Sequence, residues 1–112
     1  MKGSDREEKA LRLMGLAARA GRIIAGVPLL CTALQKSKEG KTPLLLLLAA
    51  DASQNTKKRV ADRTAYYGVP VICLSADRAT LALRAGKRDG AVAAVGITEP
   101  SLAQAIIELY HK

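Results

Sequence analysis

The chain alternates between segments in which apolar residues recur every three or four positions and shorter segments that are apolar throughout. Helical spacing runs from Ala10 to Ala20, and Gly21 then predicts the end of a helix. The longest apolar run is the seven-residue segment 44–50, which is typical of a strand buried on both faces of a sheet. A final apolar stripe follows Pro100 and predicts a C-terminal helix.

Turn-forming residues separate these segments, so helices and strands are predicted to alternate strictly along the chain. Ser4 and Glu7 have the spacing of a capping box, which predicts the start of the first helix. Strict alternation predicts a mainly parallel sheet with helices on both faces. The expected helices cover about 4–20, 28–38, 56–67, 78–85 and 98–109, and the expected strands cover 22–25, 44–50, 69–74 and 91–95.

The length and composition are those of a small globular protein. The 112 residues predict one domain, residues 1–112, because cores usually divide only in considerably longer chains. With three Tyr, no Phe and no Trp, the chain lacks the aromatic platforms on which many RNA-binding and single-strand-binding folds stack bases. Tyr66 and Tyr67 precede a predicted core strand, and we expect both to be packed anchors.

Basic residues exceed acidic ones, and their positions are informative. The chain has 18 Lys and Arg against 10 Asp and Glu, and the resulting formal charge of +8 favours a polyanionic partner. Four basic residues between Lys57 and Arg63 share one predicted helix, where they are expected to form a solvated face. Others occupy loops and helix ends that could converge on one rim, namely Arg19, Arg22, Lys36, Lys38, Lys41, Lys87 and Arg88.

The sequence lacks the residue patterns that catalysis and cofactor binding require. No phosphate-cradling glycine motif follows a predicted strand, no nucleophile has an evident base, and no zinc-ligand spacing occurs. His111, the only histidine, is expected to be solvated. These features predict a protein that is not an enzyme and that has no cofactor and no metal.

The cysteines and the apolar segments bear on location. Cys31 and Cys73 lie within apolar segments and are expected to be buried thiols in a reducing compartment. No segment approaches the roughly 20 apolar residues that a membrane-spanning helix needs, and the N-terminal residues have no signal-peptide core. We therefore expect a cytoplasmic protein that has no membrane partner and acts as a monomer.

Four segments carry a family resemblance by their order and spacing. They are Gly15 to Gly26, Leu46 to Ser53 with Asn55 and Thr56, Tyr67 to Val71, and Leu81 with Gly86 and Lys87. Together they resemble the kink-turn RNA-binding ribosomal proteins of the L-seven-Ae superfamily, in particular its small bacterial YlxQ-like branch. The resemblance implies a three-layer α/β/α sandwich around a mixed four-stranded sheet, so one strand departs from the all-parallel expectation. It also implies a non-enzymatic protein that binds ribosomal or other structured RNA with a kinked duplex, with the ribosome as a further partner.

In RNA-binding members of this family, the start of the second helix enters the kinked duplex. Gly26 matches a glycine that permits close backbone approach. Pro28 and Leu29 stand where the family has an Asn-Glu pair that reads guanine edges, and Thr32 replaces a lysine that meets the phosphates. Each lost base-edge contact removes about 1–3 kcal/mol of discrimination, by analogy with groove readout on DNA. The resemblance therefore leaves kink-turn specificity open.

Two loops complete the expected site. Ser53 stands where relatives often carry Glu, and Lys87 and Arg88 belong to the loop with which relatives hold the flipped-out nucleotide of the kink. We expect phosphate contacts to dominate, and such contacts position a nucleic acid without reading its sequence. The expected RNA-binding residues are Arg22, Gly26, Val27, Pro28, Leu29, Thr32, Lys36, Ser53, Lys87 and Arg88.

Two other interpretations stay open. Leu29 and Leu30 follow Pro28 where the family presents polar side chains, so the start of this helix could bind a protein instead. Helix phase predicts that at least one of these two leucines packs inward. An α/β sheet can also bind a phosphorylated small molecule at its strand ends, and a polar pocket near Asp51 and Ser53 would then indicate an enzyme.

Overall fold

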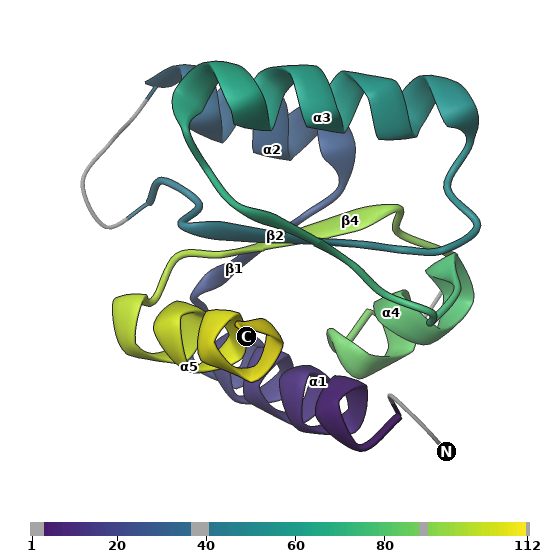
Figure 1. Ribbon diagram of the computed structural model, residues 1–112, viewed down its shortest axis with the longest axis vertical. Helices are drawn as coiled ribbons and strands as arrows, with labels where there is room; N and C mark the ends of the chain where they lie inside the picture. The colour runs from purple at the N-terminus through teal and green to yellow at the C-terminus, as the bar shows by residue number, and fades with distance from the viewer. Residues whose placement is uncertain (1–3, 37–40, 88–89, 112) are drawn as a thin grey trace.

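The computed structural model describes residues 4–36, 41–87 and 90–111, and within them helices and strands alternate as predicted (Figure 1). The largest difference is at β4, which begins at residue 94 instead of 91, because the amide of Val92 bonds the carbonyl of Arg78 (3.2 Å) and not a strand. The elements are α1 (Ser4–Arg19), β1 (Ile23–Ala25), α2 (Val27–Lys36), β2 (Leu45–Leu48), α3 (Gln54–Tyr67), β3 (Val71–Cys73), α4 (Arg78–Arg84), β4 (Ala94–Ile97) and α5 (Pro100–Tyr110).

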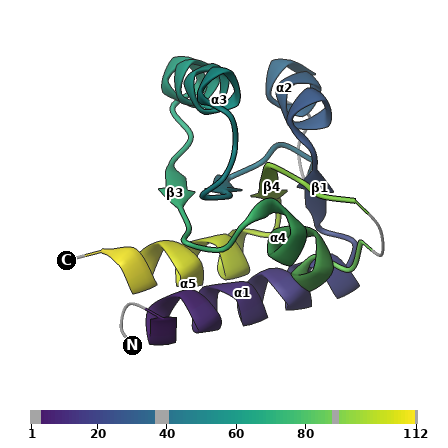
Figure 2. The same cartoon turned by 90° about the vertical axis from the view of Figure 1, so that its right-hand side faces the viewer.

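A four-stranded sheet forms the middle layer, with its strands in the order β1-β4-β2-β3. Helices α2 and α3 cover one face, and α1 and α5 cover the other (Figures 1 and 2). The shorter α4 lies on the same side as α1 and packs against it (Figure 2). This arrangement confirms the predicted three-layer sandwich. In the described part of the chain, every helix is too short or too polar to span a lipid bilayer.

The sheet is mixed because β4 runs against the other three strands. It pairs antiparallel with both β1 and β2, whereas β2 and β3 are parallel. A parallel strand would need a crossover that returns across the sheet. Helix α4 has only 7 residues and stays at the edge where β2 and β3 end, since Asp51 after β2 accepts a hydrogen bond from its first amide, Arg78 (2.8 Å). The chain therefore enters β4 from that edge, and the all-parallel expectation from alternation alone is wrong there.

Strand β2 is buried on both faces, as its apolar run predicts. Its odd-numbered leucines pack into the cluster beneath α1 and α5, and its even-numbered leucines pack into the cluster beneath α2 and α3. Burial of each leucine contributes roughly 2–3 kcal/mol relative to exposure. In β4, Gly96 lies so close to α2 that an added Cβ would be 2.5 Å from Cδ2 of Leu30. Helix α2 is therefore seated directly on the sheet.

The carboxylate of Glu7 links α1 to the turn after β3. It accepts hydrogen bonds from the amides of Ser75 (2.8 Å) and Ala76 (2.9 Å), and from the Ser75 hydroxyl (3.0 Å). Both oxygens of the Glu7 carboxylate take part in this tertiary contact, a role that the capping-box spacing does not predict. Helix α1 nevertheless begins at residue 4, as expected.

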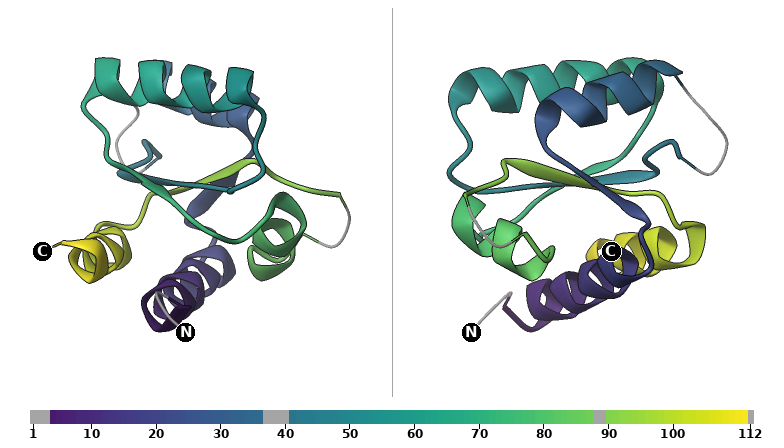
Figure 3. Two further views of the ribbon diagram at one scale, coloured as in Figure 1. Left: turned by 45° about the vertical axis from the view of Figure 1, so that its right-hand side comes forward. Right: turned by 180° about the vertical axis from the view of Figure 1, so that it is seen from behind.

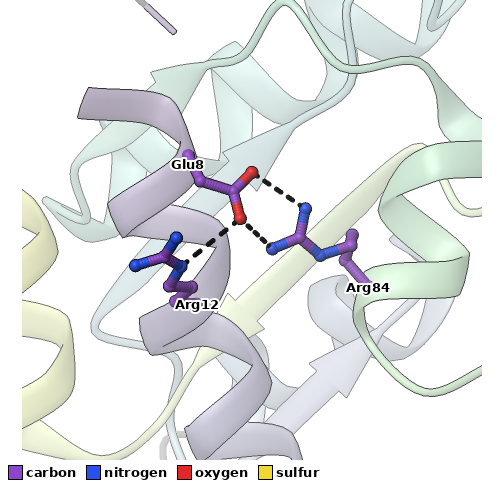
Figure 4. A network of polar contacts seen from close by, with 3 residues as sticks. All are labelled: Glu8, Arg12 and Arg84. Carbon is purple, nitrogen blue, oxygen red and sulfur yellow. Dashed lines mark hydrogen bonds and ion pairs between the residues drawn. The ribbon is translucent and has the colours of Figure 1, made fainter. Parts of the chain in front are cut away.

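A second carboxylate, that of Glu8, fixes α1 against α4 (Figure 4). Arg84 donates to it in a bidentate arrangement, from Nη1 to Oε1 at 3.1 Å and from Nη2 to Oε2 at 2.7 Å. Arg12 completes the cluster, with its Nε 3.5 Å from Oε2. The hydrogen bond from Arg84 lowers the pKa of Glu8, and the carboxylate in turn raises the pKa of Arg84. The two helices are thus held together by charge as well as by apolar packing.

Two side chains that the sequence placed in the core are exposed. Cys73 is exposed because it is the last residue of β3, an edge strand. Tyr66 is 81% exposed, since α3 buries Val60 and Thr64 and the stripe they define continues through the half-buried Tyr67 instead. The rings of Tyr66 and Tyr67 pack edge to face with centroids 4.8 Å apart. The expectation of a packed anchor therefore fails for Tyr66.

Candidate nucleic-acid interface

A cleft of about 400 Å³ lies between the edge strand β1 and one side of α2, and we call it the α2–β1 cleft. Among the described residues, the charged side chains of its lining are all lysines, and they come from three separate segments: the end of α2, the chain before β2, and the loop after α4. The cleft thus combines an apolar strand edge with a cationic rim. Its described lining consists of Ile23, Ile24, Ala25, Leu29, Thr32, Ala33, Lys36, Lys41 and Lys87.

The residue spacing in α2 explains how this helix both packs on the sheet and lines the cleft. Its buried side chains are Val27, Leu30, Cys31 and Leu34. Its cleft-lining side chains recur three and four residues apart, at Leu29, Thr32, Ala33 and Lys36. Leu29 is 63% exposed whereas Leu30 is 1% exposed, which confirms that one leucine of the pair packs inward.

The backbone at the start of α2 depends on Gly26. Its φ of +101° lies where side chains are strained, and an added Cβ would meet nothing within 4 Å. Glycine is therefore required by backbone conformation, and it leaves open space beside the chain. The Gly26 amide donates to the carbonyl of Ala94 (3.0 Å), and Pro28 has no N–H, so neither position offers an amide to a phosphate.

Ser53 and Asp51 follow β2 and hold the starts of two helices. Ser53 is the N-cap of α3, and its Oγ accepts a hydrogen bond from the amide of Thr56 (3.1 Å). Asp51 accepts from the amide of Arg78 and forms an ion pair with its Nε at 3.5 Å. The side chains of Asp51 and Ser53 are thus engaged in holding helix starts. The interpretation as an enzyme with a ligand at the strand ends depended on these two polar side chains.

Arg22 lies at the other end of β1 from Gly26. Its Nη2 donates to the carbonyl of Thr98 (3.3 Å), and its own carbonyl accepts from the amide and the hydroxyl of Thr98 (2.9 and 3.0 Å). Four positions at about 3.3 Å per residue separate Arg22 from Gly26 by about 13 Å along the strand. The guanidinium therefore belongs to the β1–β4 pairing.

The structure divides the predicted RNA-binding residues into groups. Four of them line the α2–β1 cleft: Leu29, Thr32, Lys36 and Lys87. Three others form the adjoining helix start: Gly26, Val27 and Pro28. The starts of α2 and α3 lie toward the same edge of the sheet (Figure 3), but Ser53, like Arg22, is not part of the cleft lining. Arg88 lies outside the described residues.

Sequence reasoning missed three parts of the cleft as binding elements: Ala33, Lys41 and the edge of β1. Counting three and four residues forward from Leu29 along the helix would have found Thr32 and Ala33 together. The sequence places Lys41 only on a general basic rim, because no local pattern indicates that the chain before β2 lies beside α2. The edge position of β1 depends on the order of strands, which sequence alternation does not give.

Within the described residues, the cleft lysines differ from Arg12, Arg78 and Arg84 in having no carboxylate partner. Among the residues that the structure describes, the ion pairs join Glu8 to Arg12 and Arg84, and Asp51 to Arg78. None of these pairs includes Lys36, Lys41 or Lys87. Three charges are therefore exposed around one cleft, and no carboxylate of the described residues is paired with them.

Comparisons with known proteins agree with the fold and extend it. No family model matches the chain. The sequence is 36% identical over 97 residues to "RNA-binding protein YlxQ" of Bacillus subtilis (strain 168), and the alignment covers 87% of this chain and 90% of that protein. It is 43% identical over 63 residues to "RNA-binding protein YlxQ" of Enterococcus faecium, a match that covers 56% of this chain and 57%, little more than half, of that relative.

Two solved structures share the architecture. A protein of unknown function from Bacillus halodurans superposes with a TM-score of 0.79 at 29% identity, covering 90% of this chain and 95% of that one. The 15.5 kD RNA binding protein of Giardia lamblia superposes with a TM-score of 0.76 at 17% identity, covering 94% and 84%, and this likeness concerns the fold alone. The identity and coverage of the Bacillus subtilis relative place the chain in the YlxQ branch of the L-seven-Ae-like family.

Proposed function

We propose that this protein binds structured RNA at the α2–β1 cleft and does so without catalysing a reaction. The observation that carries the proposal is the convergence of Lys36, Lys41 and Lys87 on one cleft from three segments, with no carboxylate in the described lining. Lysine ammonium groups neutralise phosphates and release their counterions, which supplies most of the affinity in non-specific binding. The names of the two YlxQ relatives, both RNA-binding proteins, support the same function.

The RNA is proposed to be a kinked duplex of ribosomal or other structured RNA, held mainly through its phosphates. The open space beside Gly26 allows close approach of an RNA backbone to the start of α2. Pro28 and Leu29 are exposed there but have no side-chain donor or acceptor for a base edge. Recognition would therefore depend on the shape of the RNA more than on its sequence. The ribosome is the proposed larger assembly.

A salt-resolved titration tests this function. A fluorescent kink-turn RNA and a straight duplex of matched length and composition are titrated with the protein at several salt concentrations. Three lysine–phosphate contacts predict that log K falls against log salt with a slope of about −2 to −3. Tighter binding of the kinked RNA would support recognition of its shape, and equal slopes with equal affinities would support phosphate binding alone. Absence of binding to either RNA at low salt would contradict the proposal.

Ribosome association has a separate test. Sedimentation of cell lysate through sucrose places a ribosome-bound protein with the subunits at low salt, and a salt wash releases it if phosphate contacts dominate. The Lys36→Ala/Lys41→Ala variant is expected to remain at the top of the gradient. Co-sedimentation of this variant with the subunits would argue for a different contact surface.

A second candidate function is protein binding at the start of α2, favoured by the 63% exposure of Leu29. A pull-down from lysate with and without ribonuclease separates the two functions. Partners that survive nuclease treatment and disappear with Leu29→Ser would favour the protein-binding function. We favour RNA because Leu29 shares its cleft with three lysines, which would surround a bound peptide with unpaired positive charge unless the peptide were acidic.

A further inference from the structure

A second depression, of about 750 Å³, lies between the C-terminal half of α1 and α4, and we call it the α1–α4 groove. It is separate from the α2–β1 cleft except that Ile23 and Lys87 line both. Figure 2 shows the two helices side by side beneath the sheet. The proposed RNA site makes no use of this groove.

The groove exposes large apolar side chains from both of its walls. Leu16 of α1 is 48% exposed and Leu83 of α4 is 69% exposed, and both line the groove. Gly15 also lines the groove, and an added Cβ there would lie at an ordinary contact distance, 3.7 Å, from the carbonyl oxygen of Arg84. Exposed apolar side chains on two elements that face one groove are typical of a site that binds another protein.

The charged residues of the groove are all basic. Arg12, Arg19, Arg84 and Lys87 line it, and no carboxylate belongs to its lining in the described part of the chain. Arg84 is held by Glu8 and therefore fixes the wall of the groove. Arg19 and Lys87 form no ion pair with any described residue, so their charges are available to a ligand.

We infer that the α1–α4 groove binds a short segment of another protein in which acidic residues flank a large apolar side chain. The apolar side chain would pack between Leu16 and Leu83, and the carboxylates would pair with Arg19 and Lys87 at the rim. This division into an apolar centre and a charged rim is the usual anatomy of protein interfaces. RNA fits the groove less well, because its phosphates would satisfy the cations but leave both leucines without an apolar partner.

Lys87 lines both the groove and the cleft, so binding at one site is expected to weaken binding at the other. A carboxylate paired with Lys87 from the groove would withdraw that cation from RNA in the α2–β1 cleft. Binding of the acidic segment is therefore expected to weaken RNA binding by roughly the effect of one phosphate contact, and reciprocally.

Selection from a phage-displayed library of random linear peptides tests the inference. The wild-type chain is the bait, and the Arg19→Glu/Leu83→Ser variant is the counter-selection. Enriched peptides are expected to carry Asp or Glu beside Leu, Ile, Met or Phe. A labelled synthetic copy of the most enriched peptide is expected to lose about tenfold in affinity on Arg19→Glu or Leu83→Ser.

Two matched variants control the measurement. Arg59→Glu makes the same charge change on α3, and Leu44→Ser removes an exposed leucine before β2, and neither residue lines the groove. Both are expected to bind the peptide within about twofold of the wild type. Circular dichroism checks that Leu83→Ser remains folded, as its exposure predicts, and Leu16→Ser serves as a second groove variant.

Three outcomes would overturn the inference. The double variant would enrich the same peptides as the wild type, the enriched peptides would lack acidic residues, or Leu83→Ser would weaken kink-turn RNA binding about tenfold. The last result would make the groove an RNA surface. The peptide and RNA measurements are independent. If no such peptide binds the groove, the proposal of RNA binding at the α2–β1 cleft still stands, and if RNA does not bind the cleft, the peptide result is still valid.

Discussion

The lysines of the α2–β1 cleft and the arginines between α1 and α4 carry the same charge but face different surroundings. Arg84 and Arg12 meet Glu8, and the bidentate contact to Arg84 holds two helices together (Figure 4). Lys36 and Lys87 face an apolar strand edge and no carboxylate in the described lining. The difference teaches that the net charge of +8 does not identify the binding surface. The proposed binding surface rests instead on the convergence of lysines from three separate segments on one cleft.

The largest effect is expected when the three lysines of the α2–β1 cleft are removed together. Lys36→Ala/Lys41→Ala/Lys87→Ala is expected to weaken RNA binding by about 100-fold at ~0.15 M salt and to bring the salt slope close to zero, because three phosphate contacts are lost. Fluorescence anisotropy at several salt concentrations measures both quantities. The matched control is Lys58→Ala/Arg59→Ala/Arg63→Ala on α3, which removes equal charge from another face. Equal losses in the two variants would mean that net charge alone accounts for binding.

The next test concerns the seating of α2, which forms one wall of the cleft. Gly96→Ala is expected to lower the free energy of unfolding by about 1–3 kcal/mol, since the new Cβ would press on Leu30 and Pro43. Gly15→Ala in α1 is the control, because its Cβ would meet only an ordinary contact and alanine favours the helix by up to about 1 kcal/mol. Urea denaturation compares them, and a neutral Gly96→Ala would show that α2 is loosely seated.

The arginine cluster is expected to govern stability and not RNA affinity. Glu8→Gln is predicted to lower the melting temperature while leaving the RNA dissociation constant within about twofold, because Glu8 faces the α1–α4 contact and not the cleft. Differential scanning fluorimetry and anisotropy measure the two effects. Weakened RNA binding in a folded Glu8→Gln variant would contradict the separation of the two sets of cations.

The same carboxylate sets a pH dependence. The folded protein lowers the pKa of Glu8 from 4.5 through the hydrogen bond from Arg84, and that of Asp77 from 3.8 through the hydrogen bond from the amide of Thr80. Because each pKa is lower in the folded than in the unfolded protein, the ionised carboxylate stabilises the fold fully at pH values above its unfolded-state pKa. That stabilisation is lost as the pH falls through the lower pKa of the folded protein. The melting temperature is therefore expected to fall below about pH 4.5, with a smaller decrease in Glu8→Gln. Equal acid sensitivity in both proteins would contradict this role.

The smallest expected effect is that of Arg22→Ala. Arg22 donates to the carbonyl of Thr98 and is not part of the cleft lining, so its removal is expected to change RNA affinity by less than about twofold. A tenfold loss would extend the RNA surface to the other end of β1. This single variant therefore decides how far the binding surface reaches beyond the cleft.

Local pattern predicted most of the fold, and the family resemblance supplied what the pattern lacked. Helical and extended spacing gave the order of elements, and the apolar run 44–50 correctly indicated a strand buried on both faces. The direction of β4 depends on where α4 sits, which is a tertiary fact that alternation does not encode. The resemblance to a family with a mixed sheet predicted it correctly.

The candidate site was harder to predict from the sequence than the fold, because it also depends on tertiary structure. Lys36 and Lys87 could be named from their positions at a helix end and a loop, but only the tertiary structure shows that Lys41, before β2, lies beside them. Arg22 is predicted with them because it lies at a helix end, whereas its guanidinium donates to the carbonyl of Thr98 and is not part of the described cleft lining.

Amide chemical-shift mapping during titration with kink-turn RNA tests the central claim most directly, because it locates the RNA on the molecule. The largest changes are predicted at β1, at 29–36 of α2, and at Lys41 and Lys87, with small changes on the outer face of α3 and on α5. Chemical-shift changes concentrated on Lys58, Arg59 and Arg63 of α3, without changes at the α2–β1 cleft, would contradict the account. They would show that RNA binds the solvated basic face of α3 instead.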